Sequence, residues 1–407
     1  MATVVVSCYN VASFAEGGGH FWVYMQYVQG LRQSGCEVYW LERYRHGRDP
    51  SGDARAMATF FARMARFGLD GKVLLYTQDD PPDGGEADLQ FIGVTRAEAE
   101  AVLRRADLVL NFHYAIDPSL LARARRTALV DIDPGLLQFW ISTGQLRVPP
   151  HDVYLTIGET VGTPGARFPD CGLPWIQFRP PVCLDQWAYS HDPQSEAFTT
   201  VAGWWSGQWV RGTVRGEEIF YENTKRVSFL EFVTLPQHTR QPLELALYFA
   251  DGDGNDWALL ERHGWRVHHS RDVAGGPEQY QAYIERSRGE FSIAKPSCMK
   301  LQNAWISDRT LCYLASGKPA VVQHTGPSAY LPNGEGLFRF ATIDEAAEAF
   351  ATINAHYERH CRAARELAET YFDARKIMDQ ILNVTRGANG QPGSASVPAD
   401  RSVGAGR

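Results

Sequence analysis

The sequence lacks the features that mark several large classes of protein. No stretch of its 407 residues is apolar over the length needed to cross a bilayer, and the N-terminus lacks the basic and apolar regions of a signal peptide. The seven cysteines are scattered, odd in number and without the spacing of a metal site, which fits a reducing cytoplasm. We therefore expect a cytoplasmic protein with no membrane span and no bound metal.

Two phosphate-binding fingerprints are also missing. There is no Walker Gly-Lys-Ser/Thr motif, and the glycines that end at His20 do not follow the GxGxxG pattern of dinucleotide-binding domains. The stretch 251–256 is acidic, but Asp256 and Arg262 stand where a calcium loop needs glycine and glutamate. We predict a strand-to-helix turn there, capped by Asn255 or Asp256. The formal net charge of -7 argues against a surface that binds nucleic acid.

What is present is a regular alternation of strands and helices. A hydrophobic content of 44% and a charged content of 21% are those of a globular chain, and 407 residues suit two domains. The alternation begins with the strand 3–8, the helix 21–31 and the strand 36–41, and it predicts an α/β fold with parallel sheets covered on both faces. We expect further helices over 54–67, 95–105, 118–125, 222–233, 255–262, 277–287, 343–356, 357–372 and 374–382, and further strands over 73–76, 108–112, 128–132, 154–157, 198–202, 243–249, 265–268 and 291–293.

A segment rich in glycine and proline, 162–181, separates two series of strand–helix units. We place the domain junction just after it, because a single α/β domain of this length would be unusual; the alternative is a long loop within one domain. The prediction is two Rossmann-like doubly wound domains, 1–190 and 191–365, that face a cleft at the carboxyl ends of their strands. Helices at 366–384 would cross back to the first domain, and 385–407 would form a disordered tail.

One stretch, 292–326, has the pattern of an anion-binding site. Ser307 and Asp308 offer N-cap side chains to a short helix, and the strand that follows it opens into a loop with Thr325 and Gly326. The free N–H groups and the dipole at a helix N-terminus favour an anion. The stretch therefore predicts a site for a phosphorylated ligand.

Two segments of the chain resemble one family. Gly19-His20 and the helix and strand that follow, HFWVYMQYVQGLRQSGCEVYWLE, resemble the first βαβ unit of glycosyltransferases with the GT-B fold. The segment 305–322, WISDRTLCYLASGKPAVV, resembles the donor-binding segment of that superfamily, where a helix N-terminus meets the diphosphate of a sugar nucleotide. The segment 331–337, LPNGEGL, and an alanine-rich helix follow in the same order. The chain is thus similar to bacterial GT-B glycosyltransferases over nearly its whole ordered length.

The resemblance implies an enzyme that transfers a sugar from a nucleotide-sugar donor to an acceptor, with no metal or other cofactor. The first domain would bind the acceptor and the second the donor. The aromatic loops of the first domain favour a small, flat or hydrophobic acceptor, such as a secondary metabolite. The alternatives are a nucleotide-sugar epimerase of the same fold and a two-lobed sugar-nucleotide-binding protein without catalysis. The oligomeric state stays open.

Donor-binding residues are expected at the cleft edge of the second domain. Lys225 stands at a helix start, where the dipole disfavours lysine unless an anion is near, and Lys295 follows a strand. The resemblance implies that a basic residue in this early helix contacts the diphosphate; the alternative for both lysines is surface charge. Trp204 lies in the loop 203–207, which either lets a ligand approach the backbone or only anchors a turn. The predicted donor-binding residues are Lys225, Lys295, Ser307, Asp308, Arg309, Thr325, Gly326 and Trp204.

Three residues of the first domain are catalytic candidates. His20 follows Gly18 and Gly19 of the cleft loop at a helix N-terminus, which lowers the pKa of the imidazole and suits a general base; otherwise it caps or packs. The resemblance implies that a histidine at this place deprotonates the acceptor in inverting members, and that His113 touches the donor sugar in retaining ones. Asp133 follows a strand at the cleft, or initiates a turn.

One departure from the family pattern concerns the ribose of the donor. Many retaining members carry a glutamate at the start of the donor-site helix and another further along it. The matching positions here are Ala304 and Cys312, so neither is acidic. The group that replaces the ribose-binding carboxylate is open, and Asp308 and Arg309 are the polar residues on offer.

Overall fold

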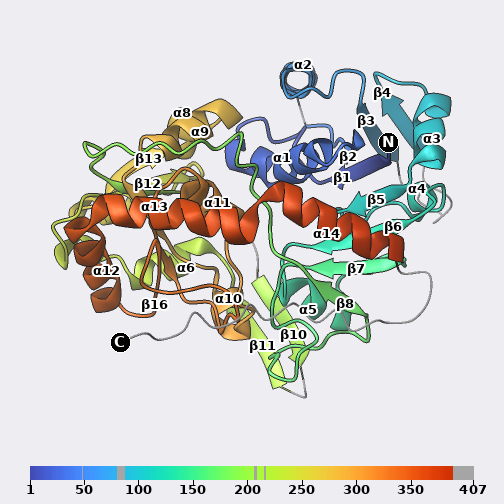
Figure 1. The fold of residues 1–407 in the computed structure, drawn as a ribbon. Helices are drawn as coiled ribbons and strands as arrows, with labels where there is room; N and C mark the ends of the chain where they lie inside the picture. The colour runs from blue at the N-terminus through green and yellow to red at the C-terminus, as the bar shows by residue number, and fades with distance from the viewer. Residues whose placement is uncertain (48, 80–87, 206–208, 215–216, 388–407) are drawn as a thin grey trace.

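The computed structural model describes residues 1–47, 49–79, 88–205, 209–214 and 217–387. Two sheets, each flanked by helices, form its two halves (Figure 1). Every strand of the two sheets runs parallel to its neighbours except β4, which is antiparallel to β3 at one edge. The predicted α/β class with two Rossmann-like sheets is therefore confirmed.

The first sheet has eight strands in the order β4-β3-β2-β1-β5-β6-β7-β8. Its central strands are apolar and buried on both faces, as expected of strands covered by helices on either side. The strands are β1 (Thr3–Cys8), β2 (Glu37–Arg43), β3 (Val73–Asp79), β4 (Asp88–Ile92), β5 (Leu108–Asn111), β6 (Thr127–Asp131), β7 (Val153–Thr156) and β8 (Trp175–Gln177), and the helices are α1 (Gly18–Gln33), α2 (Pro50–Arg66), α3 (Arg96–Arg105), α4 (Pro118–Leu121) and α5 (Leu136–Ser142).

The second sheet has six strands in the order β13-β12-β9-β14-β15-β16. A separate hairpin, β10–β11, follows β9, which is the first strand of this sheet along the chain. The strands are β9 (Phe198–Gly203), β10 (Trp209–Val214), β11 (Glu217–Glu222), β12 (Leu243–Tyr248), β13 (Arg266–His269), β14 (Gly289–Ser292), β15 (Ala320–Gln323) and β16 (Leu337–Phe340), and the helices are α6 (Lys225–Glu231), α7 (Gly254–Arg262), α8 (Ser270–Ala274), α9 (Pro277–Glu285), α10 (Pro296–Leu301) and α11 (Asp308–Ala315), with a 3-10 turn at Leu235–Gln237.

The C-terminal helices cross from the second half to the first. α12 (Ile343–Ala355) and α13 (Tyr357–Leu367) lie on the second half, and a π-helical turn, Ala368–Phe372, leads into α14 (Ala374–Gly387). Figure 1 shows α13 and α14 lying across both halves, and α14 packs on α1. α14 continues past the predicted end at Leu382, so the first residues of the predicted disordered tail are helical. The rest of that tail, 388–407, lies outside the described residues.

Several short elements differ from the sequence prediction. The strand 154–157 was expected to be the last of the first half, but β8 follows it inside the glycine- and proline-rich segment. The helix expected from Glu222 begins only at Lys225, because Glu217–Glu222 pairs with β10 as the second strand of the hairpin and Thr224 occupies the N-cap position of α6. The turn at 251–256 is not capped by Asn255 or Asp256: both lie inside α7, and Asp253 occupies the N-cap position.

No helix among the described parts of the chain combines the length and the apolarity that a membrane span requires.

The contact between α1 and α14 supports a prediction about stability. Met378 is fully buried in α14, and a Cβ added to Gly30 of α1 would lie 2.9 Å from its Cγ. Met378→Ala leaves a cavity in this contact and should lower the free energy of unfolding by about 2–5 kcal/mol. The exposed neighbour Gln380 serves as control, and Gln380→Ala should change it by less than about 0.5 kcal/mol. Urea unfolding followed by circular dichroism measures both, and equal midpoints would contradict the prediction.

Candidate active site

A cleft of about 710 Å³ lies between the two halves. β1 and β9, at which the strand order of each sheet reverses, both run toward it: Tyr9 and Asn10 follow β1, and Gly203 and Trp205 follow or end β9. Doubly wound folds bind ligands at the carboxyl ends of their strands, at the place where the strand order reverses. The volume is also that of a pocket for a small organic molecule, so this cleft is the candidate active site.

The predicted cleft glycines lie where the two halves of the molecule approach each other. Gly18 and Gly19 line the cleft, and they begin α1 where it meets the second half. A Cβ on Gly18 would lie 2.4 Å from the carbonyl oxygen of Gly276, and one on Gly19 would lie 2.8 Å from a ring carbon of Tyr280. Glycine is therefore required at the start of α1 because the backbones of the two halves approach each other there.

A second bridge lies in the loop between α10 and α11. Asn303, which is buried, donates through Nδ2 to the carbonyl oxygen of Pro134 in the first half at 2.6 Å. Its neighbours Gln302 and Ala304 both have left-handed backbones, with φ of 51° and 57°. Left-handed conformations of residues other than glycine are costly and persist only when their surroundings hold them. The loop is therefore fixed in one shape at the cleft wall.

Thr325 and Gly326 support this loop and do not line the cleft. The Thr325 hydroxyl donates to the carbonyl oxygen of Trp305 at 2.6 Å, and a Cβ on Gly326 would lie 2.7 Å from the carbonyl oxygen of Gln302. Both residues were predicted to bind the donor. The structure places them behind the loop, where they position Trp305, which does line the cleft.

The N-terminus of α11 opens into the cleft, as the sequence predicts. The Ser307 hydroxyl caps the helix by accepting from the backbone N–H of Arg309 at 3.3 Å. Ser307, Asp308 and Arg309 all line the cleft. Burial raises the pKa of the Asp308 carboxyl, and the Arg309 guanidinium partly offsets that effect.

The Arg309 guanidinium is already paired with a carboxylate. Its Nε donates to Glu290 Oε1 of β14 at 2.7 Å, and its Nη1 donates to the carbonyl oxygen of Val201 at 2.8 Å. Both ionised side chains are buried. Arg309 Nη2 and Glu290 Oε2 have no hydrogen-bond partner within the described chain. Arg309 thus keeps one guanidinium nitrogen, Nη2, without a partner in the described chain, while Glu290 offsets most of its charge.

Two lysines add positive charge to the same wall. Lys225, at the start of α6, and Lys295, at the N-cap position of α10, both line the cleft. The Lys225 ammonium donates to the carbonyl oxygen of Ile293 at 2.7 Å and lies 5.9 Å from the centre of the Trp305 ring. Burial, with a smaller contribution from Arg309, lowers the pKa of Lys225 to about 7. An anion beside this ammonium would favour its protonated form.

His20 lies on the opposite wall, in the first turn of α1. Its Nε2 donates to the carbonyl oxygen of Tyr9 at 2.7 Å, which leaves Nδ1 as the nitrogen with a free lone pair. Burial lowers the pKa of the imidazole, although the contact with Tyr9 and the charge of Asp133 oppose that shift. Gly17, and not His20, occupies the N-cap position of α1. His20 is therefore a neutral imidazole at pH 7 that lines the cleft.

Two aspartates after β6 have different surroundings. Asp133 lines the cleft and accepts from the Tyr114 hydroxyl at 3.4 Å. Asp131 is fully buried and accepts from Gln138 Nε2 and the Thr156 hydroxyl, each at 2.8 Å. Burial raises the pKa of Asp131 to about 7. Asp131 therefore holds the turn together, while Asp133 faces the ligand space.

Two predicted site residues, His113 and Trp204, lie outside the lining of the cleft. His113 is buried behind Tyr9, with 5.2 Å between the two ring centres, and burial lowers its pKa to about 4. Trp204 is fully buried and donates to Asp256 Oδ2 at 2.9 Å. Its neighbour Trp205 lines the cleft instead. Residues 206 and 207 of that predicted loop lie outside the described chain.

The sequence analysis did not name Tyr9, Phe14 or Tyr248 as site residues, and within the loop 203–207 it chose Trp204 instead of Trp205. Tyr9 and Trp205 are 39% and 43% exposed, and they follow the two central strands of the two sheets. Phe14 and Tyr248 pack edge to face, with 5.5 Å between their ring centres, and also line the cleft. The available signal was their position directly after buried strands, because the carboxyl ends of such strands carry the ligand site in this class of fold.

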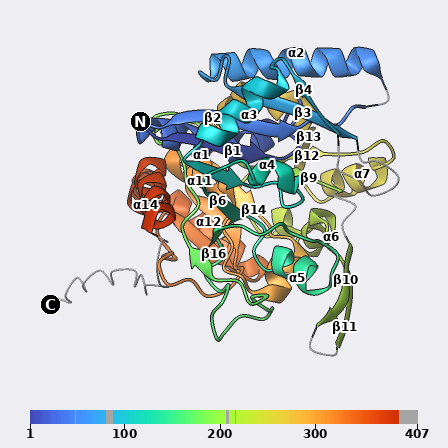
Figure 2. The ribbon, with the colours of Figure 1, turned by 90° about the vertical axis from the view of Figure 1, so that its right-hand side faces the viewer.

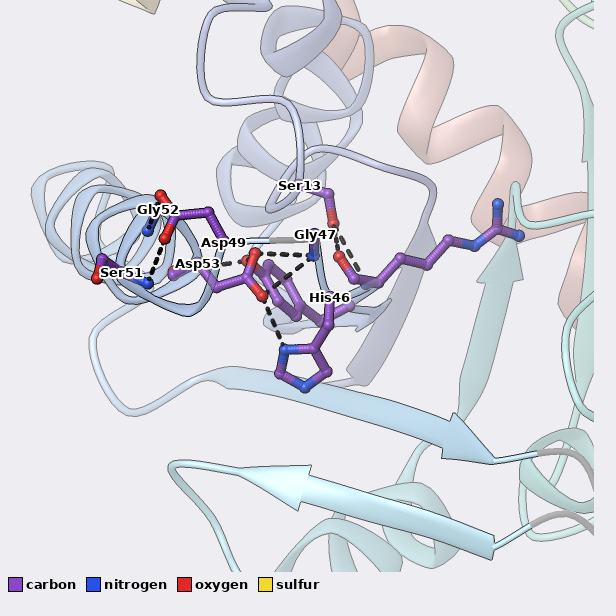
Figure 3. Close-up of polar contacts among 9 residues, drawn as sticks. Ser13, His46, Gly47, Asp49, Ser51, Gly52 and Asp53 are labelled. Atoms are coloured by element: carbon purple, nitrogen blue, oxygen red, sulfur yellow. Dashed lines mark hydrogen bonds and ion pairs between the residues drawn. The ribbon is translucent and has the colours of Figure 1, made fainter.

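The loop after β2 supports the cleft wall that the first half forms. Asp53 accepts from the Gly47 N–H at 2.9 Å, the Tyr44 hydroxyl at 3.0 Å and His46 Nδ1 at 3.1 Å (Figure 3). These contacts hold the loop that carries Arg45, whose guanidinium lies 5.5 Å from the centre of the Tyr9 ring. The Tyr9 ring is therefore in contact with the His113 ring and with the Arg45 guanidinium.

No group of three or more His, Cys, Asp or Glu side chains that is suited to hold a metal ion occurs within the ranges the structure describes.

The buried ion pair between Arg309 and Glu290 supports a prediction. Arg309→Met leaves the Glu290 carboxylate buried without its partner, so it should lower the free energy of unfolding by about 3–5 kcal/mol. Arg66→Met removes an exposed ion pair with Glu278 and should cost less than about 1 kcal/mol. The double variant Arg309→Met/Glu290→Leu should recover most of the loss. Denaturant unfolding measures all three, and equal losses for Arg309→Met and Arg66→Met would contradict a buried pair.

The similarity of this chain to known proteins lies in its structure. No known family model matches the sequence, and no curated protein matches it. Solved structures match over nearly the whole chain. An alpha-glucosyltransferase in complex with UDP and a mismatched 13-mer DNA has a TM-score of 0.57 at 10% identity, covering 95% of this chain and 99% of its own.

Two further solved structures agree with that match. AviGT4, a glycosyltransferase involved in avilamycin A biosynthesis, has a TM-score of 0.51 at 14% identity, with 95% of this chain and 97% of that chain covered. Alr3699/HepE of Anabaena in complex with UDP-glucose has a TM-score of 0.56 at 12% identity, with 94% and 99% covered. The two Rossmann-like halves around a cleft are thus the arrangement of these neighbours, and the chain has the GT-B fold.

Proposed function

We propose that this protein is a glycosyltransferase that moves a sugar from a nucleotide-sugar donor to a small-molecule acceptor without a metal ion. One observation carries the proposal: a single cleft has a helix N-terminus and two lysines on one wall and a neutral histidine on the other. The GT-B fold supports it, since neighbours with this fold were solved with UDP or UDP-glucose. In this proposal residues 1–190 bind the acceptor and 191–365 bind the donor.

The donor diphosphate would lie at the N-terminus of α11. Ser307 and Asp308 stand at that helix start, and Lys225 and Lys295 provide the charge that the paired Arg309 does not. Fixed cations and helix N–H groups stabilise the charge that develops on a leaving diphosphate. They take the part that a metal ion plays in other phosphate sites, so the proposed reaction includes no metal step.

His20 is the proposed general base if the reaction inverts the sugar. Its free Nδ1 would take the proton of an acceptor hydroxyl as that oxygen bonds to the anomeric carbon of the donor sugar. The bond from that carbon to the diphosphate breaks, and the nucleoside diphosphate leaves with the electron pair. Asp133 raises the pKa of His20 and would stabilise the imidazolium that forms. If the reaction retains the configuration, His20 positions the acceptor.

His113 is proposed as a positioning residue, because it contacts Tyr9 and does not line the cleft. The exposed rings of Tyr9 and Trp205 come from opposite halves, and Phe14 and Tyr248 extend the aromatic lining. Such a lining suits a flat or hydrophobic acceptor, such as a secondary metabolite. All seven cysteines are free thiols, which supports a cytoplasmic location.

Lys225 gives a pH test of the donor site, with UDP as the probe. Its ammonium, with a pKa of about 7 in the free protein, is stabilised by a bound diphosphate. Since the protonated form binds, UDP affinity should be greatest below about pH 7 and should fall as the pH rises from 7 to 9. Calorimetry in buffers of different ionisation enthalpy should show proton uptake on binding in this range.

The variant Lys225→Met should weaken UDP binding by about 10- to 100-fold and should remove this pH dependence. The matched control is Lys376→Met, which changes an exposed lysine of α14 and should leave both unchanged. If Lys225→Met binds UDP as the unchanged protein does, with the same slope against pH, the proposed diphosphate position is wrong.

His20→Ala should lower kcat by about 100-fold or more, while UDP affinity stays close to that of the unchanged protein. His238→Ala, which changes an exposed histidine of the second half away from the cleft lining, is the control and should keep full activity. Nucleoside diphosphate release with a panel of nucleotide sugars and aromatic acceptors measures the rate. Full activity of His20→Ala removes His20 from the mechanism. Release without dependence on any acceptor points to an epimerase or hydrolase, and binding without release points to a non-catalytic protein.

A further inference from the structure

The hairpin β10–β11 belongs to neither large sheet. It follows β9 in the chain, and Figure 2 shows it extending beyond the rest of the second half beside α5 and α6. An isolated two-stranded hairpin is only marginally stable in water, so a hairpin in this place needs support from a neighbour.

That support comes from the first half of the molecule. Val210 is buried against Leu136 and Phe139 of α5, and Ile219 and Tyr221 pack on the same cluster. Gln145 Nε2 also donates to the backbone carbonyl oxygen of Arg211 at 2.7 Å. One face of the hairpin is therefore fixed to α5.

The other face of the hairpin carries exposed aromatic rings. The cross-strand pairs Trp209–Glu222 and Arg211–Phe220 place these four side chains on the face opposite Val210, because side chains alternate along a strand. Trp209 is 52% exposed and Phe220 is 67% exposed. Their rings stack, with 4.9 Å between centres and 15° between planes. Two large aromatic side chains are thus kept together in water on a supported element.

A polar groove lies beside the aromatic pair. It has a volume of about 510 Å³ and connects the hairpin with the end of α5. Its lining includes the Arg211 and Thr213 side of the hairpin and Thr143 and Gln145 of the first half. Arg211 lines the groove and is the cross-strand partner of Phe220, so the stacking surface and the hydrogen-bonding groups adjoin each other.

We propose that this hairpin face and groove form a second saccharide-binding site, outside the cleft, that takes a neutral oligosaccharide. Pyranose rings have an apolar face of C–H groups, which packs on an aromatic ring, and hydroxyls at their edges, which bond to groups such as Arg211 and Thr213. Glu218 and Glu222 on the same face repel an anionic partner, so a nucleic acid or an acidic membrane fits poorly.

The role of this site for an acceptor rests on the proposed function. The binding of an oligosaccharide to the hairpin does not depend on that function. A small-molecule acceptor that already carries sugars would extend out of the cleft, and its sugar chain would need a binding surface there. Trp205 of the cleft lies close in sequence to Trp209 of the hairpin, and Lys300, beside the cleft residue Cys298, lies 5.0 Å from the centre of the Tyr221 ring. The supported face of the hairpin therefore adjoins the cleft wall, and the exposed face beyond it would hold a part of the acceptor or product that extends out of the cleft.

Affinity electrophoresis of the full chain tests the proposal. The gels contain glycogen, dextran, hydroxyethyl cellulose or galactomannan as neutral probes, and heparin as the anionic one. The protein should be retarded by at least one neutral polysaccharide, and Trp209→Ala/Phe220→Ala should weaken that binding by about tenfold. Tyr189→Ala, which removes another exposed ring outside the cleft and the hairpin, is the control and should bind as the unchanged protein does.

Four outcomes would overturn the proposal: no retardation by any neutral probe, retardation by heparin alone, equal retardation of the double variant, or a dimer that the double variant converts to a monomer in light scattering.

The single variants Trp209→Ser and Phe220→Ser serve if circular dichroism shows that the double variant is unfolded, and each should weaken binding. UDP binding is measured on the same samples. Loss of polysaccharide binding with UDP binding intact separates this site from the donor site, and polysaccharide binding without UDP binding would leave the hairpin site in place while the proposed function fails.

Discussion

The packing of α1 between the two halves is the contact on which the rest of the structure depends. The Trp22 indole N–H donates to the carbonyl oxygen of Pro277 at 3.0 Å, and Gln26 Oε1 accepts from the Cys183 N–H at 2.7 Å. The same helix begins at Gly18, where only glycine permits the approach of the second half. Because α1 is fixed on both sides, the carboxyl ends of the two sheets face each other across one cleft. The site is a product of this contact as much as of either sheet.

The electrostatics of the cleft follow from burial. Arg309, which the sequence suggests as a free cation for the diphosphate, is held by Glu290 on the neighbouring strand. Lys225 is instead the cation whose protonation can respond to a ligand, because burial lowers its pKa to about 7. On the opposite wall burial keeps His20 neutral. One physical cause, the removal of both groups from water, thus lowers the pKa of Lys225 and the pKa of His20.

The sequence predicted the long elements and the site elements well, and the short elements poorly. β1, α1 and α11 were found because a buried strand, a glycine stop and an N-cap serine each leave a local pattern. The hairpin and β8 were missed, because their stability comes from contacts such as those with α5, which no local pattern encodes.

The same limit applies to the site. Chain order put Thr325 and Trp204 next to residues of the cleft, but chain order does not say which way a side chain points, and neither of the two lines the cleft. The pairing of Arg309 with Glu290 likewise joins a helix to a neighbouring strand, and only the fold brings those two residues together.

The crossing of α14 to the first half has a consequence for biosynthesis. The first sheet is complete once β8 has left the ribosome, yet the face of α1 that α14 covers stays open until almost the whole described chain has been made. Gly30 and its buried neighbours on α1 are exposed for that time, and apolar surface exposed during synthesis favours aggregation. A chain that ends after the first sheet therefore leaves this apolar face of α1 uncovered, and chaperone contact during translation would fall there.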